Sequence, residues 1–127
     1  MGANLNEAGC YSDQLMAFVI TCLFCGALSK EEFNTWCAQA VSLREAPEYL
    51  YDLMTFDEAI FRVYKVIGYV PLWAHSESDE HALYGIAVLR GLNPCDMPLT
   101  ASKALGQLEA STNIKELFNR VFDFISC

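Results

Sequence analysis

The chain has little positive charge. Only 8 of its 127 residues are Lys or Arg, against 16 Asp or Glu, which gives a formal net charge of −8 at pH 7. A protein that binds nucleic acid needs clustered cations to neutralise phosphates, and the cations here are scattered along the chain. We therefore expect no DNA or RNA binding. A basic protein partner, in contrast, would be attracted and would associate faster.

Recognisable motifs of catalysis and cofactor binding are also missing. The chain contains no GxGxxG fingerprint and no P-loop, so a nucleotide site is not indicated. It contains no GxSxG nucleophile elbow and no HExxH zinc motif either. We predict that the protein is not an enzyme and has no catalytic residue, no metal, no cofactor and no small-molecule substrate.

No apolar run is long enough to span a membrane. The longest one, residues 15–28, has the length of a buried helix rather than the roughly 20 residues of a membrane span. A signal peptide needs a basic start, but no Lys or Arg precedes Lys30, and Asp13 stands just before the run. We therefore expect a cytoplasmic protein without membrane association.

The cysteines invite a disulfide or metal interpretation, but most of them fall inside apolar helical pattern, where a free cysteine packs as a small hydrophobe. Cys22 and Cys25 have CxxC spacing, without a second pair or a nearby histidine to complete four ligands. Packing of reduced thiols is favoured, with redox or metal chemistry as the alternative. Reduced thiols are typical of the cytosol. The six positions are Cys10, Cys22, Cys25, Cys37, Cys95 and Cys127.

Helical periodicity recurs along the chain, and no strand alternation interrupts it. With 54% hydrophobic residues, the chain can form a core without disulfide or metal cross-links to stabilise it. We predict an all-α fold, a single compact domain of six or seven short-to-medium helices over residues 1–127, with a polar lead-in at residues 1–11. The predicted helices cover residues 13–25, 47–54, 78–90, 101–110 and 114–125, and two more open at Ser29 and Thr55, the latter extending to about residue 67.

Two capping boxes mark helix starts. Ser29 pairs with Glu32, and Thr55 pairs with Glu58. The helix after Ser29 has the i, i+3, i+4 spacing of one buried face, formed by Phe33, Trp36, Cys37, Ala40 and Val41. Asn34, Thr35 and Gln39 are expected to face solvent. Further N-caps are predicted at Ser12, at Ser76 or Ser78, at Thr100 and at Asn113.

Residues 75–81, HSESDEH, place two imidazoles and three carboxylates close together. The favoured interpretation is a helix N-terminus, where negative charge is stabilising. A partner-facing acidic patch formed by Glu77, Asp79 and Glu80 is the second interpretation. Acid–base or metal chemistry is the third interpretation. It ranks last because the spacing matches no known motif and because a helix would turn His75 and His81 to different sides.

A second acidic segment surrounds the predicted helix 47–54. Glu48 and Asp52 lie on one helical face at i, i+4, with Asp57 and Glu58 following. Like charges at that spacing slightly destabilise a helix. The segment is therefore either an ordinary solvated surface or a negative surface held for a cationic partner, and the overall charge supports the second interpretation.

Three aromatic residues are candidates for contact area beside these acids. Tyr49 and Tyr51 could contribute amphipathic contacts, although we expect them to be half-buried core residues. Trp73 lies in a loop between apolar neighbours. It either anchors that loop onto the core or, if exposed, serves as an interface anchor.

Residues 26–56, GALSKEEFNTWCAQAVSLREAPEYLYDLMTF, resemble small helical immunity proteins of bacterial polymorphic toxin systems, including contact-dependent growth inhibition. The shared pattern is G-x-L-S-x-E-E-x-x-x-W-A, then a proline, then L-x-D-L, and Cys37 stands where alanine is common. The resemblance implies a cytoplasmic antitoxin that blocks the active site of a toxin domain, often a nuclease with a basic cleft. It also implies a gene that directly follows that of the toxin. It assigns no interface residue.

We therefore predict an immunity protein that neutralises a cognate basic toxin domain by covering the toxin's active site with an acidic surface. The alternatives are an acidic helical adaptor or subunit of a cytosolic complex, and a small metal-dependent enzyme that uses residues 75–81. Charge and expected exposure select the partner-binding residues, which are Glu48, Asp52, Asp57, Glu58, Trp73, Glu77, Asp79 and Glu80.

Overall fold

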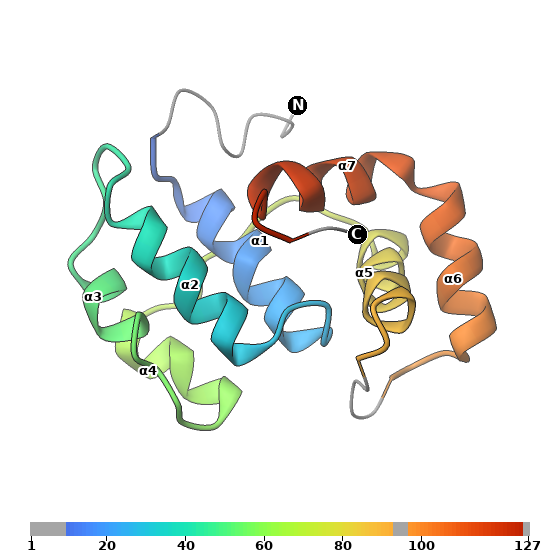
Figure 1. Ribbon diagram of the computed structural model, residues 1–127, viewed down its shortest axis with the longest axis horizontal. Coiled ribbons are helices and arrows are strands. Elements are labelled where there is room, and N and C mark those ends of the chain that lie inside the picture. Colours follow the sequence, from blue (N-terminus) through green and yellow to red (C-terminus); the bar gives the residue numbers. More distant parts are fainter. Residues whose placement is uncertain (1–9, 93–96, 126–127) are drawn as a thin grey trace. The chain divides into compact units, whose positions relative to one another are not determined.

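The computed structural model describes residues 10–92 and 97–125, and in these residues the fold is all-α, as predicted (Figure 1). They contain no β-strand, only an isolated bridge between Cys10 and Arg44. Residues 1–9 of the predicted lead-in, together with Cys95 and Cys127, lie outside the described part. The elements are α1 (Asp13–Phe24), α2 (Lys30–Ala40), α3 (Tyr49–Leu53), the 3-10 turn η3 (Ile60–Arg62), α4 (Val63–Ile67), α5 (Glu77–Leu89), α6 (Ala101–Ala110) and α7 (Thr112–Val121).

The chain divides into two compact units. Unit 1 comprises residues 1–23 and 29–74, and unit 2 comprises residues 24–28 and 75–127. Unit 1 therefore holds most of α1 together with α2, α3, η3 and α4, while unit 2 holds α5, α6 and α7. The single domain over residues 1–127 stays a prediction.

The first two helices of unit 1 begin as their sequences predict. The backbone N–H of Leu15 donates to the Ser12 hydroxyl at 3.1 Å, which caps α1. Before α2, Ser29 and Glu32 form the full capping box, with bonds of 2.9 and 3.1 Å. Local hydrogen bonds determine these starts, because a side-chain oxygen satisfies an N–H that has no partner within the helix. The buried residues of α2 are Phe33, Trp36, Cys37 and Ala40.

The second predicted capping box is wrong. Residues 55–59 are not helical, and η3 and α4 begin only at Ile60, without a side-chain cap. The reason is Asn34, which was expected to face solvent. Its amide Nδ2 donates to the backbone carbonyls of Leu53 at 2.8 Å and Phe56 at 3.1 Å. These bonds tie the backbone between Leu53 and Phe56 to α2, an interaction that the local pattern does not contain.

In unit 2 the cap of α5 is Ser76 rather than Ser78, and it forms a capping box with Asp79. α5 lies very close to α6, because Gly85 has no side chain. A Cβ at Gly85 would stand 2.4 Å from the backbone oxygen of Ala104 and 2.8 Å from the Cβ of Leu108. The missing side chain is therefore what permits this approach.

The last helix differs from its prediction at both ends. α6 is capped by Thr100 as predicted, but α7 follows it after the single residue Ser111, so Asn113 lies inside the first turn instead of capping it. α7 ends at Val121, and Phe122 leaves helical geometry at φ −114°, ψ 68°. Phe122 is fully buried, with its ring 4.8 Å from that of Phe118. Burial of the Phe122 ring accompanies this early end of the helix.

Candidate functional site

α3 presents a distinct face to solvent. The helix follows Pro47 and buries Leu50 and Leu53, while Glu48, Tyr51 and Asp52 are exposed on the other side at i, i+3, i+4 spacing. Tyr51 is 62% exposed, so the expectation that it is half-buried was wrong. In the described part of the chain, neither Glu48 nor Asp52 forms an ion pair. We call Glu48, Tyr51 and Asp52 the α3 face.

The two acids after α3 lie beside cations. The carboxylate of Glu58 is 3.6 Å from Nε of Arg62, four residues later in the sequence at i, i+4. Lys30 Nζ donates to the backbone carbonyl of Asp57 at 3.5 Å. Lys65 and Val66 line a shallow surface depression together with the Glu58–Arg62 pair. Positive charge is therefore interspersed with negative charge here, in contrast to the α3 face.

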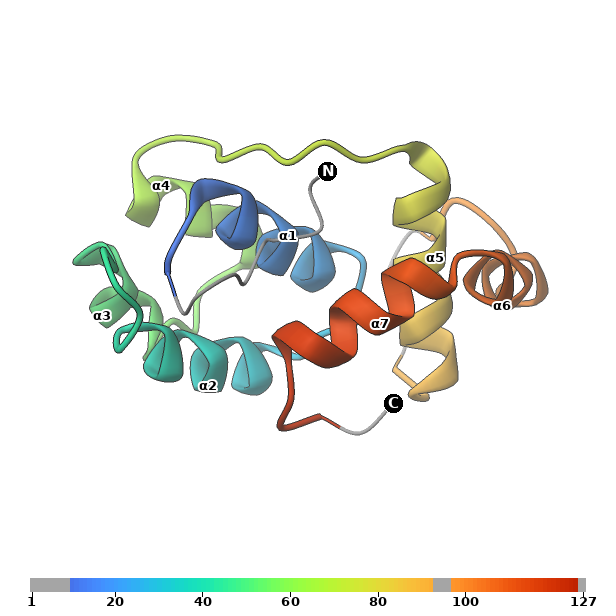
Figure 2. The same cartoon turned by 90° about the horizontal axis from the view of Figure 1, so that it is seen from above.

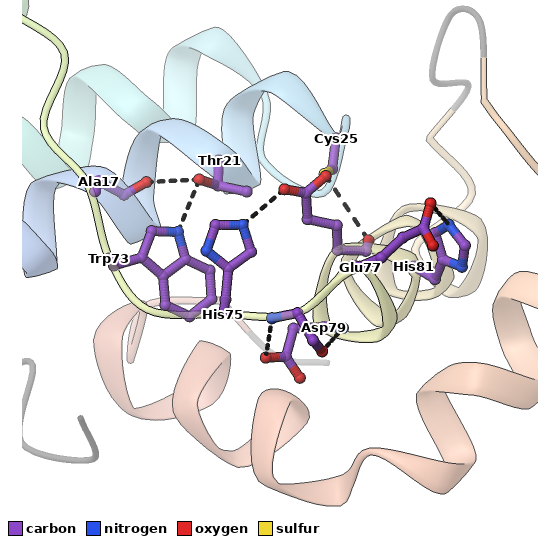
Figure 3. A network of polar contacts seen from close by, with 10 residues as sticks. Ala17, Thr21, Cys25, Trp73, His75, Glu77, Asp79 and His81 are labelled. Carbon is purple, nitrogen blue, oxygen red and sulfur yellow. Dashed lines mark hydrogen bonds and ion pairs between the residues drawn. The ribbon is translucent and has the colours of Figure 1, made fainter. Parts of the chain in front are cut away.

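The acids of residues 75–81 are engaged at the start of α5. The carboxylate of Asp79 accepts from the backbone N–H of Ser76 at 3.0 Å, as a cap. His75 Nε2 lies 2.6 Å from a carboxylate oxygen of Glu80, and His81 Nε2 lies 4.0 Å from Glu77 (Figure 3). The two histidines therefore pair with different carboxylates.

The described residues bring no three His, Cys, Asp or Glu side chains together in the way a metal site requires. Cys10, Cys22, Cys25 and Cys37 are free thiols, and all but Cys10 are buried. Cys25 Sγ contacts the backbone carbonyl of Glu80 at 3.9 Å. Burial, with the nearby Glu80 carboxylate, raises the pKa of the Cys25 thiol to about 12. A thiol with that pKa is a poor nucleophile at neutral pH.

Trp73 is held onto α1 within unit 1. Its Nε1–H donates to Thr21 Oγ1 at 3.0 Å, and the Thr21 hydroxyl donates to the Ala17 carbonyl at 2.8 Å (Figure 3). The indole also packs edge-on against the buried ring of Phe18, with centroids 5.2 Å apart. These contacts are those of a loop anchor. Contact of Trp73 with a partner stays a prediction.

Sequence reasoning missed two exposed apolar residues beside Trp73. Residues 69–74, which we call the strap, run extended after α4 (Figure 2). Val70 and Leu72 are 55% and 77% exposed, while Pro71 between them is buried. The sequence carried no signal for this exposure, because residues 69–74 are all apolar and show no alternation of polar and apolar side chains.

A chain of three tyrosines also escaped the sequence analysis. The hydroxyl of Tyr49 contacts those of Tyr11 and of Tyr69, the latter at 3.3 Å, and Tyr69 donates to the Asp13 carboxylate at 2.6 Å. Burial raises the pKa of Tyr11 and of Tyr49, and the bond to Asp13 raises that of Tyr69. The chain joins α3 to the start of α1 and to the strap.

The structure assigns the predicted partner-binding residues to two groups. Unit 1 holds Glu48, Asp52, Asp57, Glu58 and Trp73, and unit 2 holds Glu77, Asp79 and Glu80. None of the helices in residues 10–92 and 97–125 combines the length and apolarity needed to cross a bilayer. A scan against protein-family models matched none, and searches of curated proteins and of solved structures found no similar chain.

Proposed function

We propose that this protein is a binding protein that docks a basic protein partner through the α3 face. The observation that carries the proposal is the exposed ring of Tyr51 beside two carboxylates, Glu48 and Asp52, that form no ion pair in the described residues. Two like charges at i, i+4 cost a short helix stability. A cationic partner removes that cost, and an exposed tyrosine is a frequent interface hot spot.

The other acids support the choice of α3 by contrast. Asp79 caps α5, Glu80 pairs with His75, and Glu58 pairs with Arg62. A carboxylate that already has a partner gains less from a new cation, because the existing hydrogen bond or ion pair must be exchanged for it. Compared with these three carboxylates, those of the α3 face therefore gain more from a basic surface.

We propose further that the partner is a toxin domain and that the protein acts as its immunity protein in the cytoplasm. The pattern of residues 26–56 supports this, and so does the net charge of −8, which suits a basic, nuclease-type cleft. Neutralisation then requires no catalysis by this chain. The acidic face attracts the basic cleft, docks quickly, and excludes the toxin's substrate.

The proposal is tested by co-expression with the toxin domain encoded directly upstream. We expect the wild-type chain to restore growth and the double variant Glu48→Lys/Asp52→Lys to fail. The matched control is Glu109→Lys/Glu116→Lys, which changes the charge equally at exposed positions of α6 and α7 and should still protect.

Stopped-flow measurement of the rate of association with the purified toxin domain tests whether docking is driven by charge. The α3 double variant should associate about tenfold more slowly at low ionic strength, and the difference should shrink at high salt because charges are screened. An association rate that neither the substitutions nor the salt alters would refute docking through the α3 face.

A further inference from the structure

The strap is fixed in place although two of its side chains are exposed. At its start, Tyr69 donates to Asp13 at 2.6 Å. Near its end, Trp73 is held by Thr21 and Phe18, and Pro71 in the middle is buried. Val70 and Leu72 alternate with these fixed residues. Their exposure therefore belongs to a defined conformation of the chain and not to a loose loop.

The strap is also tied to α3. The hydroxyls of Tyr49, on α3, and Tyr69, on the strap, lie 3.3 Å apart, and the two rings meet edge to face with centroids at 6.4 Å. In the sequence, Tyr49 directly follows Glu48 and stands two residues before Tyr51, so it lies next to the α3 face. A protein that covers the α3 face and extends toward Tyr69 would therefore reach the exposed strap as well.

Resting on the proposed function, we infer that Val70 and Leu72 form the apolar anchor of the same docking surface. The partner is then a basic protein surface that presents an apolar side chain next to its cations. The carboxylates of the α3 face select the basic surface by charge complementarity. Interfaces commonly combine an apolar anchor with a charged rim, which is the combination that unit 1 offers here. The sequence offered Trp73 either as a core anchor or as an interface anchor, and its ring packs on Phe18.

The test uses two peptides of equal charge, a lysine–serine repeat and the same repeat with two serines replaced by leucine. Fluorescence anisotropy measures the binding of each to the full chain. We expect wild type to bind the leucine peptide about tenfold more tightly, from the added apolar burial. Val70→Ser/Leu72→Ser should lose this preference and keep its affinity for the lysine–serine peptide.

The control is Leu89→Ser on α5, since Leu89 is also exposed, at 49%, but lies in unit 2. It should keep the wild-type preference. The inference is overturned if wild type shows no preference, or if the strap variant retains it. It is also overturned if sedimentation shows a dimer that Val70→Ser/Leu72→Ser abolishes, because the occupant is then a second copy.

The two proposals fail in different ways. If Glu48→Lys/Asp52→Lys leaves the affinity for the lysine–serine peptide unchanged, docking through the α3 face is wrong. If that affinity falls but the leucine preference does not depend on the strap, only the role of Val70 and Leu72 is wrong.

Discussion

Replacing Gly85 by alanine tests the close approach of α5 and α6 in unit 2. A Cβ at this position would lie 2.4 Å from the Ala104 carbonyl oxygen and 2.8 Å from the Leu108 Cβ. Both atoms are far inside normal contact distance. The oxygen belongs to the backbone in the interior of α6, so relief requires a shift of the whole helix and not the rotation of one side chain.

The magnitude follows from two opposed effects. Alanine is favoured over glycine inside a helix by about 1 kcal/mol. Overpacking a well-packed contact costs about 1–3 kcal/mol, and a clash with backbone belongs at the upper end. We therefore expect Gly85→Ala to lower the free energy of unfolding by about 2 kcal/mol.

Gly106 provides the matched control, because it lies within α6 and a Cβ there meets nothing within 4 Å. Gly106→Ala introduces no clash, so only the greater helix preference of alanine over glycine should act. It should stabilise the protein by about 0.5–1 kcal/mol. Urea unfolding monitored by circular dichroism should move the two midpoints in opposite directions at unchanged m-value. A Gly85→Ala variant as stable as Gly106→Ala would show that α5 and α6 do not approach as described.

Three further predictions concern the remaining contacts. Asn34→Ala removes two hydrogen bonds to backbone carbonyls at the end of α3 and should cost about 1–3 kcal/mol in urea unfolding, whereas Gln39→Ala on the exposed side of α2 should change stability by less than about 0.5 kcal/mol. Stability should fall as pH rises above about 10, because the tyrosines ionise first in the unfolded chain and their raised pKa values keep them neutral when folded. Tyr49→Phe should make that decline shallower, and an equal slope would contradict the raised pKa. Cys25 is buried and its pKa is raised to about 12, so it should resist iodoacetamide in the native protein near pH 8 and react after unfolding. Peptide mass spectrometry measures the labelling, and rapid labelling of the native protein would refute the burial of Cys25.

Helix starts show where sequence reasoning succeeds. Ser29 with Glu32, Ser76 with Asp79, and Thr100 cap helices through bonds that span three residues. The cap and its partner lie within one turn of each other, so the local pattern indicated these starts, with Ser78 left as the alternative to Ser76.

Thr55 with Glu58 has the same pattern and caps nothing. A side chain 22 residues earlier, Asn34, holds the Phe56 carbonyl instead. α7 also ends differently from its prediction, four residues before the predicted boundary. The local pattern is not sufficient where a distant side chain also binds the backbone of the segment, as Asn34 does here.

The sequence likewise predicted some features of the candidate site and not others. The sequence determined that Glu48 and Asp52 share a helical face, because the spacing i, i+4 places them there in any helix. It did not determine that Glu80 pairs with His75, or that Glu48 and Asp52 form no ion pair in the described residues. It also did not indicate that Tyr49 and Tyr69 meet, or that Leu72 is exposed beside a buried proline.

The sequence by itself determined an all-helical, acidic chain, because periodicity, caps and charge are properties of neighbouring residues. Only the tertiary structure decided how closely Gly85 lets α5 approach α6, that Tyr49 meets Tyr69, and which apolar side chains are exposed in a fixed conformation. These depend on contacts between residues far apart in the chain, and such contacts leave no mark in a local pattern.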